Sequence, residues 1–255
     1  MAVSARTATE SSTSNNPFIR SLASSNRTAR DQALESLRTY LTRLQSFTSL
    51  DLLKIWKGLY YSMFMSDKPR NQQRLARDMA DLTDCFTTFA GKVAWMGSFW
   101  TTMSREWKGI DSLRMDKYLY LIRCHVNKGF VVCQKTQWSE KVVEDYNEVV
   151  GGEGGPLSAR DAKVPIGLRL HVLDIWVDEL EKVDVERVAP VKTVMEPMRT
   201  LSKDSLVKSV RVRAGEQIED DRLADGKAWA EPTEENEAEE EKAAGDNGDF
   251  GGFDD

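Results

Sequence analysis

A helical spacing of apolar residues recurs along most of this sequence and limits the folds that the chain can adopt. Between residues 50 and 65 the apolar residues return every three or four positions, as they do on one face of an α-helix: Leu52, Ile55, Trp56, Leu59 and Met63. The same spacing is found in residues 26–45, 69–89, 92–108, 113–135, 137–149 and 166–180. Because no stretch has the alternation and turn of a β-hairpin, we predict an all-α fold.

The order and length of these segments predict a HEAT-like α-solenoid of paired amphipathic helices. Helices in series with short connections are typical of stacked helix pairs, and the absence of a strict period predicts degenerate repeats. We place this helical-repeat domain at residues 16–200. The sequence GGEGGP predicts a Gly-rich loop at 151–156, which is either a flexible insertion or the loop between the last helical pairs.

Charge divides the chain into two parts. Residues 214–255 contain 16 acidic and 3 basic residues, which leaves 25 acidic and 32 basic residues in 1–213. We expect a basic body that suits a polyanion or an acidic protein, followed by an acidic disordered tail at 214–255. The Ser/Thr-rich residues 1–15 are expected to form a disordered N-terminus.

The sequence contains none of the common catalytic motifs. Phosphate-binding loops, nucleophile elbows and zinc-protease motifs are all missing from it. The only histidines are His125 and His171, and Cys124 faces away from the adjacent His125 on a helix. Without spaced ligands or a triad, we expect no catalytic residue, metal, cofactor or small-molecule substrate. No apolar run is long enough for a membrane span, so no membrane contact is expected.

Two basic segments are candidate contacts for RNA or an acidic partner. Arg70, Arg74 and Arg77 lie at i, i+4 and i+7 opposite an apolar stripe, where they form either a phosphate-binding face or an ordinary solvated face. Apolar and basic residues alternate near residue 210, so we predict a basic extended arm at 201–213. Its candidate contact residues are Lys203, Lys208, Arg211 and Arg213.

Two further features are candidate protein interfaces. Asp174, Asp178 and Glu181 lie at i, i+4 and i+7, which favours a solvated face or a face that meets a basic partner over a metal cage. Trp95 lies opposite the row of Trp107 and is a candidate exposed anchor. The final stretch GDFGGFDD resembles a short linear motif, with chance as the alternative explanation.

Four segments of the chain share a pattern with a known family: residues 16–41, 52–82, 99–123 and 167–183. The most specific pieces are WKGLYYSMFMSDKP at 56–69 and WKGIDSLRMDKY at 107–118. In these segments the chain resembles the ribosomal RNA processing protein 1 family of nucleolar factors, in a fungal-type short form. The GGEGGP loop lies outside the segments that carry the family pattern, and the chain ends in an acidic tail where many members carry a long basic extension.

The resemblance implies a non-enzymatic assembly factor of nucleolar pre-60S particles that is required for processing of large-subunit rRNA. Its implied partners are other assembly factors, including Brix-domain and WD-repeat proteins, ribosomal proteins and rRNA. Two alternatives stay open at this point. They are an RNA-processing enzyme such as a ribonuclease, and a HEAT-type adaptor that is unrelated to ribosomes.

Overall fold

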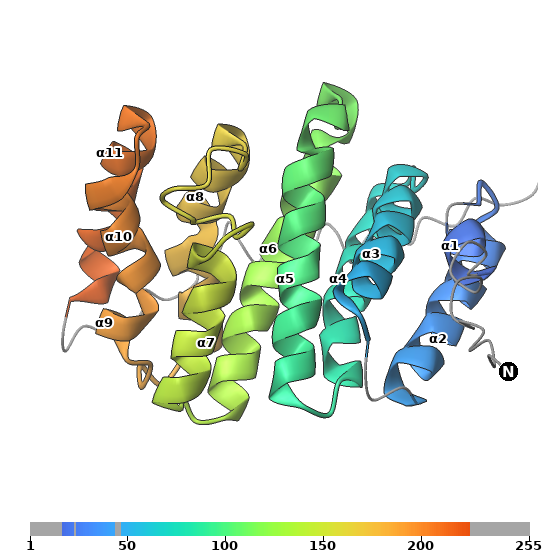
Figure 1. Cartoon of the computed structure of the whole chain (residues 1–255), viewed down its shortest axis with the longest axis horizontal. Helices are drawn as coiled ribbons and strands as arrows, with labels where there is room; N and C mark the ends of the chain where they lie inside the picture. The colour runs from blue at the N-terminus through green and yellow to red at the C-terminus, as the bar shows by residue number, and fades with distance from the viewer. Residues whose placement is uncertain (1–16, 23, 44–46, 225–255) are drawn as a thin grey trace, which may run out of the picture.

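The computed structural model describes residues 17–22, 24–43 and 47–224, and these residues form α-helices, short 3-10 helices and connecting loops (Figure 1). No strand occurs within these ranges, so the prediction of an all-α fold is confirmed. The elements in chain order are α1 (Pro17–Leu22), α2 (Arg27–Arg43), α3 (Ser49–Phe64), α4 (Pro69–Asp81), η1 (Leu82–Cys85), α5 (Phe89–Glu106), η2 (Trp107–Gly109), α6 (Ser112–Lys135), α7 (Glu140–Gly151), α8 (Ile166–Val183), α9 (Val191–Val194), α10 (Glu196–Asp204), α11 (Lys208–Ile218) and η3 (Asp221–Leu223).

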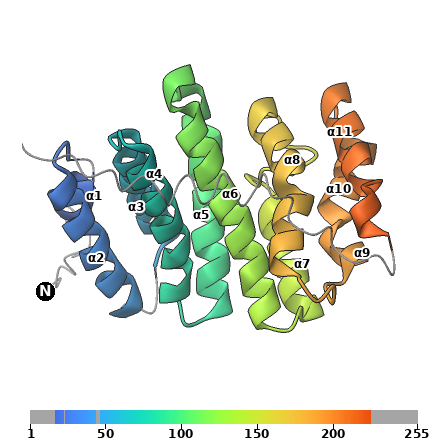
Figure 2. The same cartoon turned by 180° about the vertical axis from the view of Figure 1, so that it is seen from behind.

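The helices are arranged as stacked pairs in two layers (Figures 1 and 2). Helices α1, α3, α5, α7 and α10 form one layer, and α2, α4, α6, α8 and α11 form the other. Within a layer each helix packs beside the corresponding helix of the next pair, as α4 does against α6 and α6 against α8. This arrangement confirms the predicted α-solenoid.

The up-and-down course of the chain separates its turns into two edges. The turns inside a pair lie along the upper edge in Figure 1, which we call the intra-pair edge, and the turns between pairs lie along the lower edge. Side-chain caps fix several helix starts. Thr48 and Asp51 form a capping box at α3, and Asp111 accepts a hydrogen bond from the Arg114 amide at the start of α6.

Aromatic side chains fill the space between the two layers. The Trp56 ring of α3 lies 4.5 Å from that of Trp95 and 4.9 Å from that of Phe99, both on α5. The Phe99 ring in turn stacks on His125 of α6 at a centroid distance of 3.7 Å. A second aromatic cluster, Phe130, Tyr146 and Trp176, joins α6, α7 and α8. Large aromatic residues bury much apolar area each, so these contacts contribute strongly to the cohesion of the layers.

The predicted extended arm at 201–213 is wrong. Helix α10 continues to Asp204 and α11 begins at Lys208, with only a three-residue turn between them. The sequence alternation was misleading because the buried residues of α11 are Val210 and Ala214, one helical turn apart, whereas Val212 is exposed. Helix α11 packs on α10 and α8.

The predicted boundary of the acidic tail is also wrong at its start. Residues 214–224 belong to the end of α11 and to η3, so the folded body continues past residue 213. The remainder of the predicted tail, 225–255, and the predicted N-terminal segment 1–15 lie outside the described residues.

The Gly-rich sequence forms a connection inside the fourth pair, between α7 and α8. This position differs from one of the two predicted alternatives, a loop between the last helical pairs, and leaves the other, an insertion. The Arg169 guanidinium donates hydrogen bonds to the carbonyl oxygens of Ser158 and Asp161, and the Asp161 carboxylate accepts one from the Gly154 amide at 3.1 Å. Gly154 has a φ of 78°, which a residue with a side chain adopts only with strain. The loop is therefore held by a buried arginine.

The packing of α6 on α7 generates a stability prediction at Gly129. A Cβ atom at this position would overlap the ring of Tyr146, and that ring cannot move aside because Phe130 and Trp176 pack against it. We expect Gly129→Ala to lower the free energy of unfolding by about 1–3 kcal/mol, although alanine favours a helix. Urea denaturation measures the change.

Gly97→Ala on α5 is the matched control. No heavy atom lies within 4 Å of the Cβ position there, so the same substitution should raise the free energy of unfolding by about 0.5–1 kcal/mol. Equal effects of the two substitutions would contradict the close contact between α6 and α7.

Candidate interaction surfaces

The two histidines and Cys124 are the side chains that the sequence offers for acid–base or nucleophilic chemistry, and His125 is buried whereas His171 and Cys124 are partly buried. Burial lowers the pKa of His125 to about 4, and its Nδ1 lies 2.9 Å from the Leu121 carbonyl oxygen. Burial also lowers the pKa of His171, whose Nε2 lies 3.0 Å from the Leu119 carbonyl oxygen. The pKa of the Cys124 thiol is raised by burial to about 12, so this thiol does not form a thiolate at neutral pH. Burial therefore keeps the His125 imidazole and the Cys124 thiol neutral at pH 7.

No metal site or membrane-spanning helix is found in the described part of the chain. Nowhere in it do three or more His, Cys, Asp or Glu side chains gather so that they could hold an ion. None of its helices combines the length and apolar character that crossing a bilayer requires.

The basic face of α4 makes contacts with neighbouring helices. Arg74 forms an ion pair with Asp31 of α2 at 3.1 Å, and Arg77 donates to the Tyr120 hydroxyl of α6 at 2.8 Å. Arg70 is exposed at the start of α4. Two of the three predicted phosphate contacts are therefore engaged between helix pairs, and Arg74 is still half exposed.

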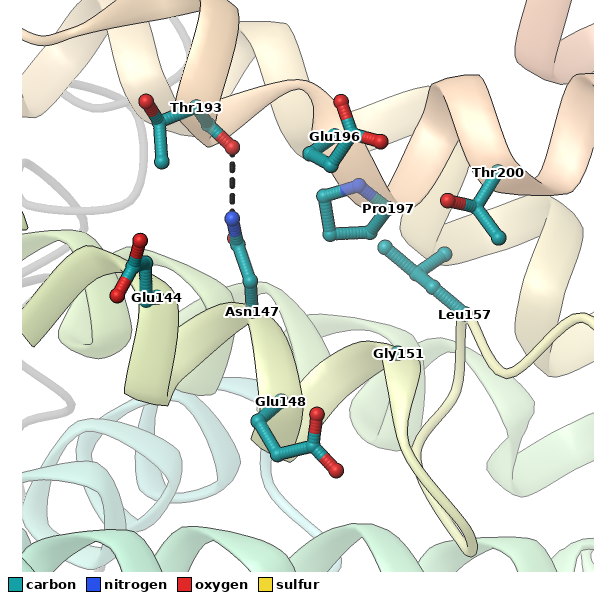
Figure 3. A pocket seen from close by; sticks show the side chains of 9 residues that line it. All are labelled: Glu144, Asn147, Glu148, Gly151, Leu157, Thr193, Glu196, Pro197 and Thr200. Atoms are coloured by element: carbon teal, nitrogen blue, oxygen red, sulfur yellow. Dashed lines mark hydrogen bonds between the residues drawn. The ribbon is translucent and has the colours of Figure 1, made fainter. Parts of the chain in front are cut away.

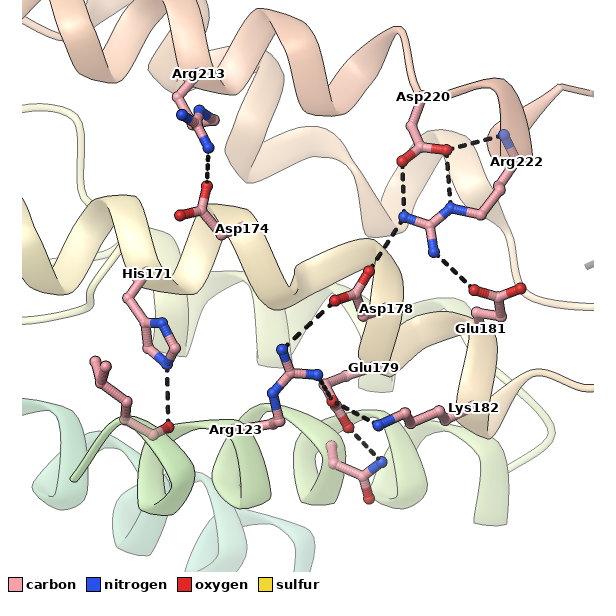
Figure 4. Close-up of polar contacts among 12 residues, drawn as sticks. Arg123, His171, Asp174, Asp178, Glu179, Glu181, Lys182, Arg213, Asp220 and Arg222 are labelled. Carbon is pink, nitrogen blue, oxygen red and sulfur yellow. Dashed lines mark hydrogen bonds and ion pairs between the residues drawn. The ribbon is translucent and has the colours of Figure 1, made fainter. Parts of the chain in front are cut away.

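The acidic stripe of α8 meets basic residues of the same chain (Figure 4). Asp174 pairs with Arg213 of α11, and Asp178 pairs with Arg222 after α11 at 3.2 Å. Arg222 also pairs with Glu181 at 2.7 Å. The predicted basic partner of this face is thus present within the fold, and a contact of the stripe with an outside protein stays a prediction.

Helices α6 and α8 are joined by the same network. Arg123 of α6 pairs with Glu179 at 2.7 Å, and Asn127 donates to the other oxygen of that carboxylate at 2.9 Å. Glu179 is almost fully buried, so these bonds offset the cost of removing its charge from water. Sequence reasoning did not find Arg123 or Glu179, because neither belongs to a charged stripe.

At least one polar contact closes each joint of the second layer, and we call the series made of one such contact per joint the polar ladder. It connects α2 to α4, α4 to α6, α6 to α8 and α8 to α11. Its members are Asp31–Arg74, Arg77–Tyr120, Arg123–Glu179 and Asp174–Arg213.

The remaining predicted contacts differ in exposure. Lys203 and Lys208 are exposed and form no ion pair with another described residue, so they are accessible as predicted. Arg211 donates to the Ser205 carbonyl oxygen at 2.7 Å and thereby holds the turn before α11. The prediction that Trp95 is an exposed anchor is wrong, because its side chain is fully buried against Trp56 and Phe86. Helix α5 is covered by α3 on the side where Trp95 lies.

Basic residues that do not belong to the polar ladder are concentrated at the intra-pair edge. Its five turns, with their flanking helix ends, have net charges of +2, +1, +1, +1 and +2. These segments are 20–27, 65–70, 105–117, 151–169 and 203–211. Seven exposed cations in them form no ion pair with any described residue: Arg20, Lys68, Lys108, Arg160, Lys163, Lys203 and Lys208. The turns at the opposite edge, 81–92, 134–141 and 182–192, have net charges of −1, +1 and +1.

A groove of about 430 Å³ lies between α7 and the start of α10 (Figure 3). Glu144, Glu148 and Glu196 line it, and Asn147 crosses it by donating to the Thr193 carbonyl oxygen at 2.6 Å. This hydrogen bond connects the fourth pair to α9 and places the groove at a joint of the solenoid.

A comparison with known proteins finds a family whose match extends over the whole described fold. A family model described as "Nucleolar protein, Nop52" matches residues 13–251 and so includes every described helix. Human ribosomal RNA processing protein 1 homolog B is 39% identical over 171 residues, which cover 65% of this chain and 22% of the relative. Human homolog A is 35% identical over 196 residues, which cover 73% of this chain and 42% of the relative.

Mouse homolog A is 38% identical over 167 residues, which cover 64% of this chain and 33% of that protein. The chain therefore spans less than half the length of each of these relatives. These matches confirm the resemblance that the motifs at 56–69 and 107–118 carry.

The network around Arg222 predicts that this residue fastens the end of the fold to α8. Arg222→Ala removes its bonds to Asp178, Glu181 and Asp220. We expect a loss of about 1–2 kcal/mol in the free energy of unfolding, and faster amide exchange in residues 208–224. Denaturation and hydrogen-exchange mass spectrometry measure the two effects.

Arg105→Ala is the control, since Arg105 pairs only with the adjacent Glu106 at the surface. It should change stability by no more than about 0.5 kcal/mol. If Arg222→Ala behaved in the same way, the network would not fasten the C-terminal pair.

The buried His125 predicts a pH dependence of stability. Below about pH 6.5 the unfolded chain protonates this side chain, whereas the folded chain does so only near its lowered pKa of about 4. The unfolded state thus binds more protons in this window, and the free energy of unfolding falls as the pH drops. The contribution of His125 amounts to about 3 kcal/mol between pH 7 and pH 4.

Urea denaturation of wild type and His125→Leu at several pH values tests this contribution. The variant should lose less stability than wild type between pH 7 and pH 4. His171→Leu is the comparison, because it leaves the contribution of His125 in place. An identical pH dependence for wild type and His125→Leu would contradict the buried neutral imidazole.

Proposed function

Since the chain belongs to the Nop52 family of nucleolar proteins, we propose that it acts in ribosomal RNA processing as a non-enzymatic scaffold of large-subunit precursor particles. The names of the human and mouse relatives support the link to ribosomal RNA processing. The family match extends over the whole described solenoid, so the proposal concerns this helical body.

The polar ladder is the observation that carries the scaffold role. A scaffold must keep its binding surfaces at fixed distances, and charge-assisted hydrogen bonds between successive pairs oppose sliding of one pair on the next. Arg123 and Glu179 do this at the most buried joint, with 2.7 Å between nitrogen and oxygen. The aromatic contacts between the layers add to this rigidity.

The exposed cations of the intra-pair edge support contact with rRNA. Lys203 and Lys208 lie on either side of the turn between α10 and α11, and neither forms an ion pair within the described chain. Cations placed in this way bind phosphate groups without reading sequence. The protein partners in this proposal are assembly factors of the Brix-domain and WD-repeat classes, together with ribosomal proteins.

Depletion of the protein from cells tests the processing role. We expect precursors of the large-subunit rRNA to accumulate on Northern blots, and the protein to co-sediment with large-subunit precursor particles. Re-expression of the wild-type chain should restore processing. Normal maturation of large-subunit rRNA after depletion would contradict the proposal.

A charge-reversal pair tests the rRNA contact separately. Lys203→Glu with Lys208→Glu should release the protein from particles at lower salt than wild type, because phosphate contacts are lost. Lys92→Glu with Lys192→Glu is the control, since these two lysines form no ion pair with a described residue and lie toward the opposite edge. Unchanged melting temperatures would show that both folds are intact, and equal salt sensitivity of the two variants would exclude this contact.

A further inference from the structure

The C-terminal end of α3 and the N-terminal end of α6 form an exposed surface of apolar side chains, and lysines without an ion-pair partner in the described chain lie in the adjoining turns. Tyr61 and Met65 at the end of α3 are each 38% exposed, and Leu113 at the start of α6 is 93% exposed. The Arg114 guanidinium carbon lies 4.2 Å from the ring centroid of Phe64 and connects the two helix ends. We call these five residues the α3–α6 patch.

Two lysines lie in the turns that adjoin the patch, Lys68 after the end of α3 and Lys108 before the start of α6. Lys68 and Lys108 are exposed and have no ion-pair partner in the described chain, and they lie in the turns of the second and third pairs. The patch therefore offers apolar contact area with positive charge beside it. A ligand that fits it has apolar side chains flanked by carboxylates.

A buried lysine holds the patch in one shape. Lys117 Nζ donates to the carbonyl oxygens of Phe64 and Ser66 at 2.9 and 2.7 Å, which fixes the end of α3 against α6. Burial lowers the pKa of this lysine, and the two carbonyl oxygens compensate its charge. A surface that is already ordered loses little entropy when a ligand binds.

We propose that the segment 249–255 of the same chain, DFGGFDD, docks on the α3–α6 patch. This segment has the required chemistry, with Phe250 and Phe253 as apolar anchors and Asp249, Asp254 and Asp255 as flanking carboxylates. The motif has no role in the proposed scaffold function.

The spacing of the two phenylalanines matches the spacing of the solenoid. In an extended chain three residues span about 10 Å, and neighbouring helices pack about 8–10 Å apart. One ring can therefore contact the end of α3 beside Met65 while the other contacts Leu113. The aspartates then lie next to Lys68 and Lys108, where their charges are complementary.

The connecting segment is long enough for this contact within one chain. Residues 225–248 can span up to about 80 Å. The patch lies two helix positions from α8, about 20 Å along the layer, and one helix length of about 27 Å across it. Because Arg222, three residues before this segment, is held beside α8, the docking site is within reach of the chain.

Carbodiimide cross-linking of the full chain tests the proposal, because the reagent joins a lysine amine to a carboxylate that touches it. We expect mass spectrometry to find cross-links from Lys68 or Lys108 to the aspartates of 249–255. Phe250→Ala with Phe253→Ala should abolish these cross-links, and so should Leu113→Ser. Val185→Ser with Val188→Ser, two exposed valines at the opposite edge, should leave them unchanged.

Mixing isotope-labelled and unlabelled chains separates docking within one chain from docking on a second copy. Cross-links within one label class support the proposal, whereas mixed-label cross-links would assign the contact to a second copy and overturn it. Cross-links that survive the loss of both phenylalanines would mean a contact by charge alone, which also overturns it. Absence of these cross-links from the full wild-type chain would leave the patch for a different partner and overturn it as well.

Discussion

The position of α6 depends on three cations that each reach a different neighbour. Lys117 donates to backbone carbonyls at the end of α3, Lys128 pairs with Asp81 at the end of α4, and Arg123 pairs with Glu179 of α8. Lys117 and Lys128 are each 7% exposed. A buried charge without a partner costs several kcal/mol, so α6 has one register in which all three are satisfied. This register aligns the second, third and fourth pairs.

Helical spacing in the sequence predicts the fold because each helix buries the residues that recur at that spacing. The five apolar residues predicted for residues 50–65 are all buried: Leu52, Ile55, Trp56, Leu59 and Met63. The same reasoning fails at Trp95, because α5 has neighbours in its own layer as well as in the opposite layer. A helix with neighbours on several sides buries more than one stripe, so a residue opposite the main stripe need not be exposed.

The charged sites could be located in the sequence, but their partners could not. The sequence predicts Asp174 and Arg213 as contacts for outside partners, but in the structure they pair with each other across 39 positions of sequence. Arg77 meets Tyr120 in the same way, 43 positions away. Only the stacking of the helix pairs brings such residues together, since an i, i+4 pattern identifies a face without identifying what covers it. The wrong prediction of an extended arm at 201–213 has the same cause, because the sequence does not show that α11 packs on α8.

The internal pairing of charges determines which surface is left for outside ligands. A ligand that binds the face of the second layer has to compete with the polar ladder, and breaking partly buried, charge-assisted hydrogen bonds costs more than it returns unless each one is replaced. Lysines such as Lys68, Lys108 and Lys203 on the intra-pair edge have no such bond to give up. Their attraction to a phosphate or carboxylate is weakened by water and by salt, but no internal partner competes for it. Recognition of acidic ligands by this solenoid is therefore favoured along its turns, where the geometry of the stack sets the distance from one cation to the next.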